Sequence, residues 1–550
     1  MAISKAVRNL AIRNAAQRNL AIRNVVRTMV LATCALVLAL AAPATALAGE
    51  VAVTGDNATD YLAYQVFSAD VADGRASNVA WGSAAARDAA AKAGAPTTTA
   101  QDAADWINAN LSDGNSVAYG LASALMQGGA TPARLTAGRA ATLQSGYWLI
   151  VADEFALGEQ QTGTAPIFVL VGDGSRSVKP KSAVPTVTKH VQENSTSAWQ
   201  KAADATVGDD VLWRLEATVP AGVQGYTSYD VVFADTMSAG LDPSKVASSA
   251  RVYVKAGTGS AWVKSTADVP TTGEKNAAGW QDVTAQCTIE TNGQDSSVKS
   301  PNLVALLGAD ALKAGGAQVC VIYNAPLNKK CNHGAAEGNP NTVHLEYPKS
   351  PFSYQDHLST PEDKATAYTW DVLLTKRSSA GDAVLSGAVL GVVDPQGRHL
   401  GQDGSWSSAS RTVTTNAKGQ VTLSGVDSGT YHVSEVKAPE GYQRFEGTRK
   451  LVLTVTGLDV RQVASAHPTL TIQAESPLRA DSVSATTSLA QASILNTPTT
   501  TVPPTPKGGN GIVKTGDLVN LAPAALLALA GAGLAVMGLR VRRRGEKNHR

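Results

Sequence analysis

The stretch Gly429-Thr-Tyr-His-Val-Ser-Glu-Val-Lys-Ala-Pro-Glu-Gly-Tyr442 decides the fold of the C-terminal third of the chain. Apolar and polar side chains alternate through its first half, which predicts a strand with one buried face. Turn signals precede it at Asp394-Pro-Gln-Gly397, Asn416-Ala-Lys-Gly419 and Asp427-Ser-Gly429. Strands separated by such turns every eight to twelve residues or so are typical of β-sandwiches.

Two strand-like runs frame this segment. Tyr368-Thr-Trp-Asp-Val-Leu-Leu-Thr-Lys376 opens the region and Ser493-Ile-Leu-Asn496 closes it. Together with the segment around Glu435, they resemble the prealbumin-like (CnaB-type) domain of Gram-positive pilins and adhesins, in which that segment is called the E-box. The resemblance implies a covalent isopeptide bond between Lys376 and Asn496, with Glu435 as the acid that promotes it.

The chemistry of such a bond accounts for the three residue types. An amine attacks only in its neutral form, and burial among apolar neighbours lowers the pKa of a lysine. A buried, protonated glutamic acid can polarise the asparagine carbonyl by donating a hydrogen bond. The alternative is a strand-end lysine, a surface glutamate and a C-terminal asparagine that make ordinary salt bridges and hydrogen bonds.

Residues 181–355 resemble, less completely, the middle domain of these pilins. Pro185-Thr-Val-Thr-Lys189 is similar to its first strand, whose lysine forms an intramolecular isopeptide bond, and the segment around Asp235 is similar to the strand that carries the acid. The closing strand of that family reads Tyr-Ser-Asn-Asn-Pro, whereas this chain has Tyr347-Pro-Lys-Ser-Pro351. The usual acceptor is therefore missing, and the partner of Lys189 stays open, with Asn341 as one candidate.

A short motif before this domain bears on assembly. Val178-Lys-Pro-Lys181 resembles the backbone-pilin motif Val-Tyr-Pro-Lys, whose lysine joins one subunit to the next. The resemblance places that nucleophile at Lys181, and Lys179 stands where the family has tyrosine. The alternative is that Lys181 and Lys189 are solvated lysines flanking a linker.

The N-terminal part of the sequence predicts a targeting segment followed by a domain that contains both strands and helix. Residues 1–48 have a basic start, an apolar run and a small-residue site, the layout of a secretory signal peptide cleaved between Ala48 and Gly49. Residues 49–180 mix strand-like runs with an Ala-rich helical stretch from Ser83 to Leu111. This segment is predicted to be an N-terminal pilin domain.

The C-terminal end has a three-part layout. Residues 499–511 are a Pro/Thr/Gly spacer. Within residues 512–550, Ile512-Val-Lys-Thr-Gly516 precedes an apolar stretch that, as a helix of about 33 Å, could cross a bilayer, and a basic tail follows. This order resembles the LPXTG sorting signal of Gram-positive surface proteins. It implies that a sortase cleaves between Thr515 and Gly516 and couples Thr515 to an amine; the alternative is a plain tail anchor.

Composition narrows the class of protein. Residues 1–48 and 516–550 hold twelve of the 47 basic residues and two of the 45 acidic ones, which leaves a net charge of −8 for the rest of the chain. This acidic middle argues against nucleic acid as a partner, because binding nucleic acid needs a basic surface. Cys331, His333 and His344 match no standard zinc spacing, no nucleotide-binding or hydrolase motif occurs, and the sequence predicts no metal or cofactor. Pairing among Cys287, Cys320 and Cys331 stays open.

The predicted architecture is mainly β. Tandem Ig-like or prealbumin-like sandwiches occupy residues 181–355 and 366–498, and the N-terminal domain contains some helix. The resemblance predicts no enzymatic activity beyond autocatalytic isopeptide formation.

The predicted function is that of a structural subunit of a covalently polymerised fimbria, secreted, anchored to the cell wall and used in adhesion. The expected partners are a sortase, other copies of the chain, minor pilins, peptidoglycan and a host or bacterial surface ligand. The alternatives are a monomeric wall-anchored adhesin, a minor or tip pilin, and a secreted enzyme with β-sandwich accessory modules.

Overall fold

The computed structural model describes residues 48–54, 60–111, 116–158, 161–163, 165–180, 184–221, 223–258, 278–460 and 468–499. The chain forms two units, residues 1–498 and 499–550. The predicted signal peptide up to residue 47, Lys181 and the sorting signal at 512–550 lie outside the described residues. No helix within the described ranges is long and apolar enough to cross a membrane.

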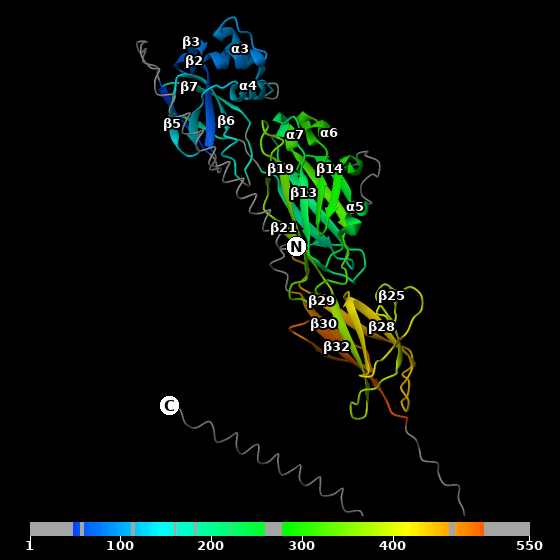
Figure 1. Ribbon diagram of the computed structural model, residues 1–550. Helices are drawn as coiled ribbons and strands as arrows, with labels where there is room; N and C mark the ends of the chain where they lie inside the picture. The colour runs from blue at the N-terminus through cyan, green and yellow to red at the C-terminus, as the bar shows by residue number, and fades with distance from the viewer. Residues whose placement is uncertain are drawn as a thin grey trace, which may run out of the picture. The chain divides into compact units, whose positions relative to one another are not determined.

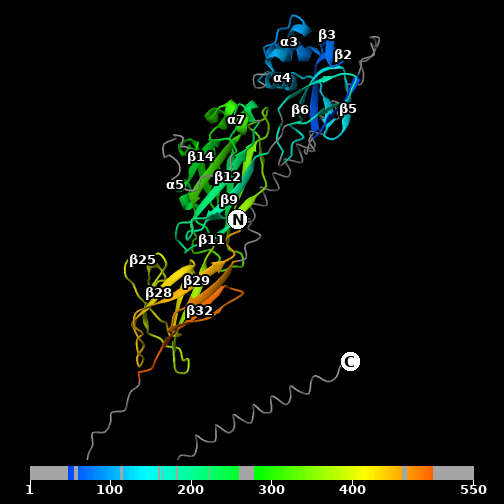
Figure 2. The ribbon, with the colours of Figure 1, turned by 180° about the vertical axis from the view of Figure 1, so that it is seen from behind.

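Residues 48–180 combine two sheets with helices. The elements are β1 (Ala48–Val53), β2 (Asp60–Ala72), β3 (Arg75–Trp81), α2 (Ala84–Lys92), α3 (Ala100–Asn110), α4 (Ser116–Gln127), β4 (Ala133–Thr136), β5 (Ala140–Gln144), β6 (Gly146–Ala152), β7 (Ile167–Val171) and β8 (Arg176–Val178). One sheet has the order β5-β1-β8, and the other has β3-β2-β6-β7 with β4 beside β2. Helices α3 and α4 lie beside β2 and β6 in both views (Figure 1 and Figure 2).

Local capping explains where the first helices begin. The side chain of Ser83 accepts a hydrogen bond from the Ala86 N–H at the start of α2, and Thr99 accepts from the Asp102 N–H at the start of α3. The predicted helical stretch is thus confirmed as α2 and α3. Helix α4 was not predicted, although its Leu121 and Leu125 share one buried face at helical spacing.

The middle domain is a sandwich of two sheets. Its elements are β9 (Thr186–Gln192), β10 (Trp199–Gln200), β11 (Ala202–Asp204), β12 (Leu212–Val219), η1 (Val223–Gly225), β13 (Val232–Met237), η2 (Pro243–Lys245), α5 (Val246–Ser249), β14 (Arg251–Ala256), β15 (Gln281–Asp282), η4 (Thr284–Gln286), β16 (Thr288–Asn292), β17 (Asp295–Lys299), α6 (Leu303–Leu307), α7 (Ala309–Gly315), β18 (Ala317–Asn324), β19 (Asn339–Pro348), β20 (His357–Ser359) and β21 (Asp363–Tyr368). The sheet orders are β10-β9-β12-β18-β14-β15 and β11-β21-β19-β13-β17-β16, with β20 beside β19. One core, which includes Trp213 from the first sheet and Phe233 from the second, fills the space between them.

The third domain is a smaller sandwich, drawn yellow to orange in Figure 1. Its strands are β22 (Trp370–Ser378), β23 (Val389–Val393), β24 (His399–Leu400), β25 (Trp406–Ser407), β26 (Val413–Thr414), β27 (Gln420–Val426), β28 (Gly429–Lys437), β29 (Thr448–Thr456), β30 (Thr469–Ala474), β31 (Leu478–Val483) and β32 (Leu489–Asn496). The sheet orders are β27-β22-β32-β31 and β25-β24-β23-β28-β29-β30, with β26 beside β23. The first and last strands, β22 and β32, are parallel neighbours, with Ser378 opposite Asn496.

The mainly β fold class and the helical content of the N-terminal region are therefore confirmed. Two of the three predicted turns, Asp394–Gly397 and Asn416–Gly419, form with a hydrogen bond across the turn. Gly397 and Gly419 have positive φ values of 80° and 70°, and each donates its N–H to the carbonyl of the residue that opens its turn, Asp394 and Asn416.

Candidate functional site

In the third domain, three strands each carry a row of apolar side chains on their core face, and each row is followed by one polar side chain. A strand presents every second side chain to the same face, so Lys376, Glu435 and Asn496 point into the core that the preceding residues form. Those apolar residues are Trp370, Val372 and Leu374 in β22, Tyr431 and Val433 in β28, and Ala490, Ala492 and Ile494 in β32. The three polar residues are 0 %, 2 % and 2 % exposed, which overturns the alternative of a surface glutamate.

The three side chains contact one another. The Lys376 ammonium donates a hydrogen bond to Asn496 Oδ1 and lies 3.1 Å from Glu435 Oε1. Asn496 Nδ2 donates to Oε1 and Oε2 of Glu435 at 2.9 and 3.0 Å. The attacking amine, the carboxamide and the acid of an isopeptide reaction are therefore all within hydrogen-bonding distance.

The surroundings favour a neutral amine. Burial lowers the pKa of Lys376 to about 8, although the charge of Glu435 acts in the opposite direction. The ring of Phe445 lies 5.5 Å from the Lys376 ammonium, and the Phe445 N–H donates to Glu435 Oε2 at 3.0 Å. The segment after β28 thus covers the three residues and fixes the carboxyl group.

Gly419 allows the backbone to close beside the lysine. The Lys376 N–H donates to the Gly419 carbonyl at 2.7 Å, and a Cβ at Gly419 would lie 2.9 Å from the Leu385 carbonyl oxygen. With a φ of 70° as well, the position requires glycine. The Asn416–Gly419 turn signal therefore helps to place the reactive residue.

The middle domain brings together a second set of buried polar residues by the same alternation. Lys189 in β9 and Tyr323 in β18 belong to one sheet, and Asp235 in β13 and Asn341 in β19 belong to the other. All four are at most 3 % exposed. Lys189 is therefore not a solvated lysine, which corrects that alternative for this position.

The tyrosine hydroxyl is the centre of this set. Lys189 Nζ donates to Asp235 Oδ1 and, at 3.0 Å, to Tyr323 Oη. Asn341 Nδ2 donates to Tyr323 Oη at 2.8 Å, while the hydroxyl itself donates to Asp235 Oδ2. Burial lowers the pKa of Lys189 to about 8, against the effect of Asp235, and raises that of Tyr323. The structure thus places Asn341, the candidate acceptor, in the same network as Lys189.

Two participants in this region were missed from the sequence. Tyr323 follows Val319 and Val321 on the core face of β18, so strand alternation alone could have placed it inside. Lys201 donates to the Lys189 carbonyl at 2.6 Å and to Asp363, which also accepts the Lys189 N–H. No local pattern marks Lys201, because its partners come from distant strands.

Other predicted site residues stand apart from these two clusters. Ala48 and Gly49, at the predicted signal cleavage site, are the first residues of β1, and Gly49 pairs with Leu143 of β5. Lys181, Thr515 and Gly516 lie outside the described residues. Within the part of the chain that is described, the three cysteines are free thiols, and no cluster of His, Cys, Asp or Glu could hold a metal ion.

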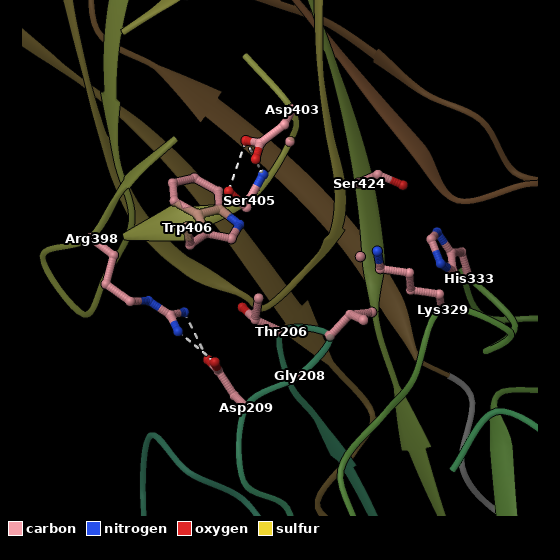
Figure 3. A pocket seen from close by; sticks show the side chains of 13 residues that line it. Thr206, Gly208, Asp209, Lys329, His333, Arg398, Asp403, Ser405, Trp406 and Ser424 are labelled. Carbon is pink, nitrogen blue, oxygen red and sulfur yellow. Dashed lines mark hydrogen bonds and ion pairs between the residues drawn. The ribbon is translucent and has the colours of Figure 1, made fainter. Parts of the chain in front are cut away.

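A cavity of about 530 Å³ lies away from both lysine clusters (Figure 3). Arg398 points across it and makes two hydrogen bonds to Asp209, at 2.5 and 2.8 Å. Ser405 donates to Asp403 on the same wall. The Arg398 guanidinium and the Asp209 carboxylate therefore pair with each other on the wall of this cavity.

Asp204 and Asp427 form a buried pair of carboxyl groups near Glu193. Trp370 Nε1 donates to Asp204 Oδ2 at 2.7 Å, and the Ser428 N–H donates to Asp204 Oδ2 and Asp427 Oδ1 at 3.0 and 2.8 Å. Burial, reinforced by the neighbouring negative charges, raises the pKa of both carboxyl groups. At least one proton is therefore held more tightly in the folded protein than in the unfolded chain.

We expect this pair to make stability fall as the pH rises. A raised pKa in the folded state contributes stability below the unfolded value of about 4, and that contribution is lost as the pH rises through the folded value. In Asp427→Asn, the melting temperature between about pH 5 and about pH 8 should decline less than in wild type. The exposed carboxylate of Asp403 provides the control, since Asp403→Asn should keep the wild-type slope. An equal decline in Asp427→Asn would contradict the assignment.

Parts of the chain are similar in sequence to known proteins. Residues 371–464 match the family model of the prealbumin-like fold domain. In sequence, the chain is 27 % identical over 161 residues to the trypsin-resistant surface T6 protein of Streptococcus pyogenes serotype M6. That similarity covers 27 % of this chain and 28 % of the relative, so the chain spans little more than a quarter of the relative's length.

Solved structures of pilins are also similar to the chain. The T6 backbone pilin of Streptococcus pyogenes serotype M6 has a TM-score of 0.49 and 16 % identity, with 84 % of this chain and 100 % of that chain covered. The major pilin SpaD of Corynebacterium diphtheriae has a TM-score of 0.40 and 13 % identity, with 84 % and 99 % covered. Residues 371–464 are therefore similar to the prealbumin-like fold domain, and part of the chain is similar to a streptococcal surface protein, as the sequence resemblance led us to expect.

Proposed function

We propose that the chain is a shaft subunit of a covalently polymerised fimbria, exported and then anchored to the cell wall. The observation that carries the proposal is the buried contact of Lys376, Glu435 and Asn496. The first two lie within residues 371–464, which match the prealbumin-like fold domain. Sequence similarity to a streptococcal surface protein supports the cell-surface location. The two ends of the chain supply the export and sorting signals that such a subunit needs.

In the third domain, the proposed reaction joins Lys376 Nζ to Asn496 Cγ. A proton first passes from the ammonium of Lys376 to Glu435, and the neutral amine attacks the carboxamide carbon. The bond between Cγ and Nδ2 then breaks, and ammonia leaves while Glu435 ends as the neutral acid. This role is supported by the hydrogen bonds that Asn496 Nδ2 donates to both oxygens of Glu435. The acid would therefore act at the leaving nitrogen, and not at the carbonyl oxygen as expected from the sequence.

In the middle domain, the proposed crosslink joins Lys189 to Asn341. The two side chains lie in the same buried network, with Asp235 as the acid. They come from facing sheets, so a bond between them would fasten the two layers of the sandwich together. Asn341 would then take the place of the acceptor asparagine that is missing from Tyr347–Pro351.

For assembly, a sortase would form an acyl-enzyme with Thr515 and release the chain from Gly516 onward. The amine of Lys181 in another copy would then attack that thioester, and an amide bond would join the two copies. Repetition of a head-to-tail bond gives an open fibre, as expected for a heterologous contact. The partners in this scheme are the sortase, further copies or minor pilins, and finally peptidoglycan.

Cell-wall extracts test this proposal. An antibody to the chain should reveal a ladder of high-mass species, and released protein should end at Thr515 coupled to an amine. A single band that ends at coupled Thr515 would indicate a monomeric wall-anchored adhesin instead. Recovery of the intact chain to Arg550 in membranes would indicate a tail anchor and contradict the sorting step.

A further inference from the structure

The two domains differ in the group that contacts the side-chain nitrogen of the asparagine: a tyrosine hydroxyl in the middle domain and a carboxyl group in the third domain. In the third domain, the leaving nitrogen of Asn496 contacts the acid directly. In the middle domain, Asn341 Nδ2 donates to Tyr323 Oη at 2.8 Å, and that hydroxyl donates to Asp235. No hydrogen bond joins Asp235 to Asn341 within the described ranges. The hydroxyl of Tyr323 is thus the link between acid and amide.

Side-chain length gives a physical reason for the difference. Aspartate is one methylene shorter than glutamate. Both oxygens of Asp235 already accept hydrogen bonds, one from the Lys189 ammonium and the other from the Tyr323 hydroxyl. Glu435 reaches both the lysine and the asparagine. An intermediate hydroxyl allows the shorter acid to act on the amide.

We propose that Tyr323 is a catalytic residue of the Lys189–Asn341 crosslink and relays a proton from Asp235 to the leaving nitrogen of Asn341. The inference rests on the middle-domain crosslink proposed above. Lys189 first gives one proton to Asp235 and attacks Cγ of Asn341. The Tyr323 hydroxyl donates its proton to Nδ2 and takes the proton held by Asp235. Nδ2 leaves as ammonia, and the second proton lost from Lys189 returns Asp235 to the neutral acid.

The hydrogen-bond network fixes the orientation that this relay needs. A phenol has one proton to donate, and Tyr323 gives it to the Asp235 carboxylate before reaction. Asn341 must therefore present its NH2 group, not its oxygen, to Tyr323. Asn341 Oδ1, which is buried and has no hydrogen-bond partner among the described residues, is left to gain negative charge when the amine attacks.

The hydroxyl is also suited to a relay because it keeps its proton. Burial and the charge of Asp235 raise the pKa of Tyr323 well above its usual value. The phenol therefore stays protonated beside Asp235 and can pass a proton only when another replaces it.

Tryptic mass mapping of the secreted full-length protein tests the relay. In wild type, peptides 182–201 and 331–349 should remain joined with a loss of about 17 Da, the mass of ammonia. Tyr323→Phe keeps the ring and removes the hydroxyl. Since a general acid commonly contributes at least about 100-fold to a rate, the joined species should form at least about 100-fold more slowly. The joined peptides of the third domain, which contain Lys376 and Asn496, should be unchanged and so show that the effect is confined to the middle domain.

Two variants complete the experiment. Tyr229→Phe alters another buried tyrosine of the same core and should crosslink as wild type does. Asp235→Glu combined with Tyr323→Phe lengthens the acid and should restore part of the crosslink. Crosslinking at the wild-type rate in Tyr323→Phe, or no recovery in the folded double variant, would overturn the relay. A wild-type middle domain without the joined peptides would overturn the crosslink itself, and the relay with it.

Discussion

In a Glu435→Ala variant, we expect trypsin to cleave after Lys376 and to release peptides 365–376 and 480–507 separately. In wild type, peptides 365–377 and 480–507 should remain joined and lack about 17 Da, the mass of ammonia. The substitution leaves Lys376 and Asn496 in place and removes the acid that lies 3.1 Å from the amine. The variant therefore tests whether the acid is needed for the bond to form when both reacting residues are present. Mass spectrometry of the digested protein gives the result directly.

The same variant should lose considerable stability. Lys376 and Asn496 are 120 positions apart, and closing a loop of that length should stabilise the folded state by about 4–5 kcal/mol, by analogy with a disulfide. The melting temperature of the third domain should fall accordingly. Glu440→Ala, which removes an exposed carboxylate of the same segment, should keep both the joined peptides and the melting temperature. Wild-type protein in which these two peptides separate would refute the crosslink.

Replacement of Lys181 by arginine should abolish the polymer ladder while leaving wall-anchored monomer. Arginine keeps the positive charge, but its guanidinium stays protonated and cannot attack a thioester. The measurement is an immunoblot of cell-wall extracts from strains that express each variant. The expected effect is complete, because a subunit without the amine cannot accept the next one.

Lys179 provides the matched control for this experiment. It lies two positions before Lys181, directly after β8, and is exposed. Lys179→Arg should therefore leave the ladder intact. If the ladder survives in Lys181→Arg and disappears in Lys179→Arg, the nucleophile is Lys179, and the assignment from the motif is wrong.

The third domain could be predicted largely from its sequence. The alternation of Trp370, Val372 and Leu374 fixes which face of β22 is buried, and the same period carries Lys376 inside. Local turns at Gly397 and Gly419 set where the strands end. The contact of Lys376 with Asn496 was expected only through the resemblance, because strands at opposite ends of a domain pair through long-range packing that no local pattern records.

The middle domain shows where such prediction stops. Lys189 and Asp235 were named from motifs, but the choice of Asn341 depends on its pairing beside Met237 of β13, which only the register of the sheet determines. Tyr323 carried no motif at all. Its importance comes from the meeting of two sheets, since its partners come from three other strands.

The parallel pairing of β22 and β32 has a mechanical consequence. The chain enters this pair at Trp370 and leaves it at Asn496, at opposite ends, so tension on the two ends shears the ladder of paired residues instead of unzipping it. A bond from Lys376 to Asn496 would shorten the tensioned path to little more than β22. The roughly 120 residues between the bonded positions would then add no length to the chain under tension. Without the bond, the same residues could unfold and extend to about 400 Å. On this geometry the third domain behaves under load as an inextensible link.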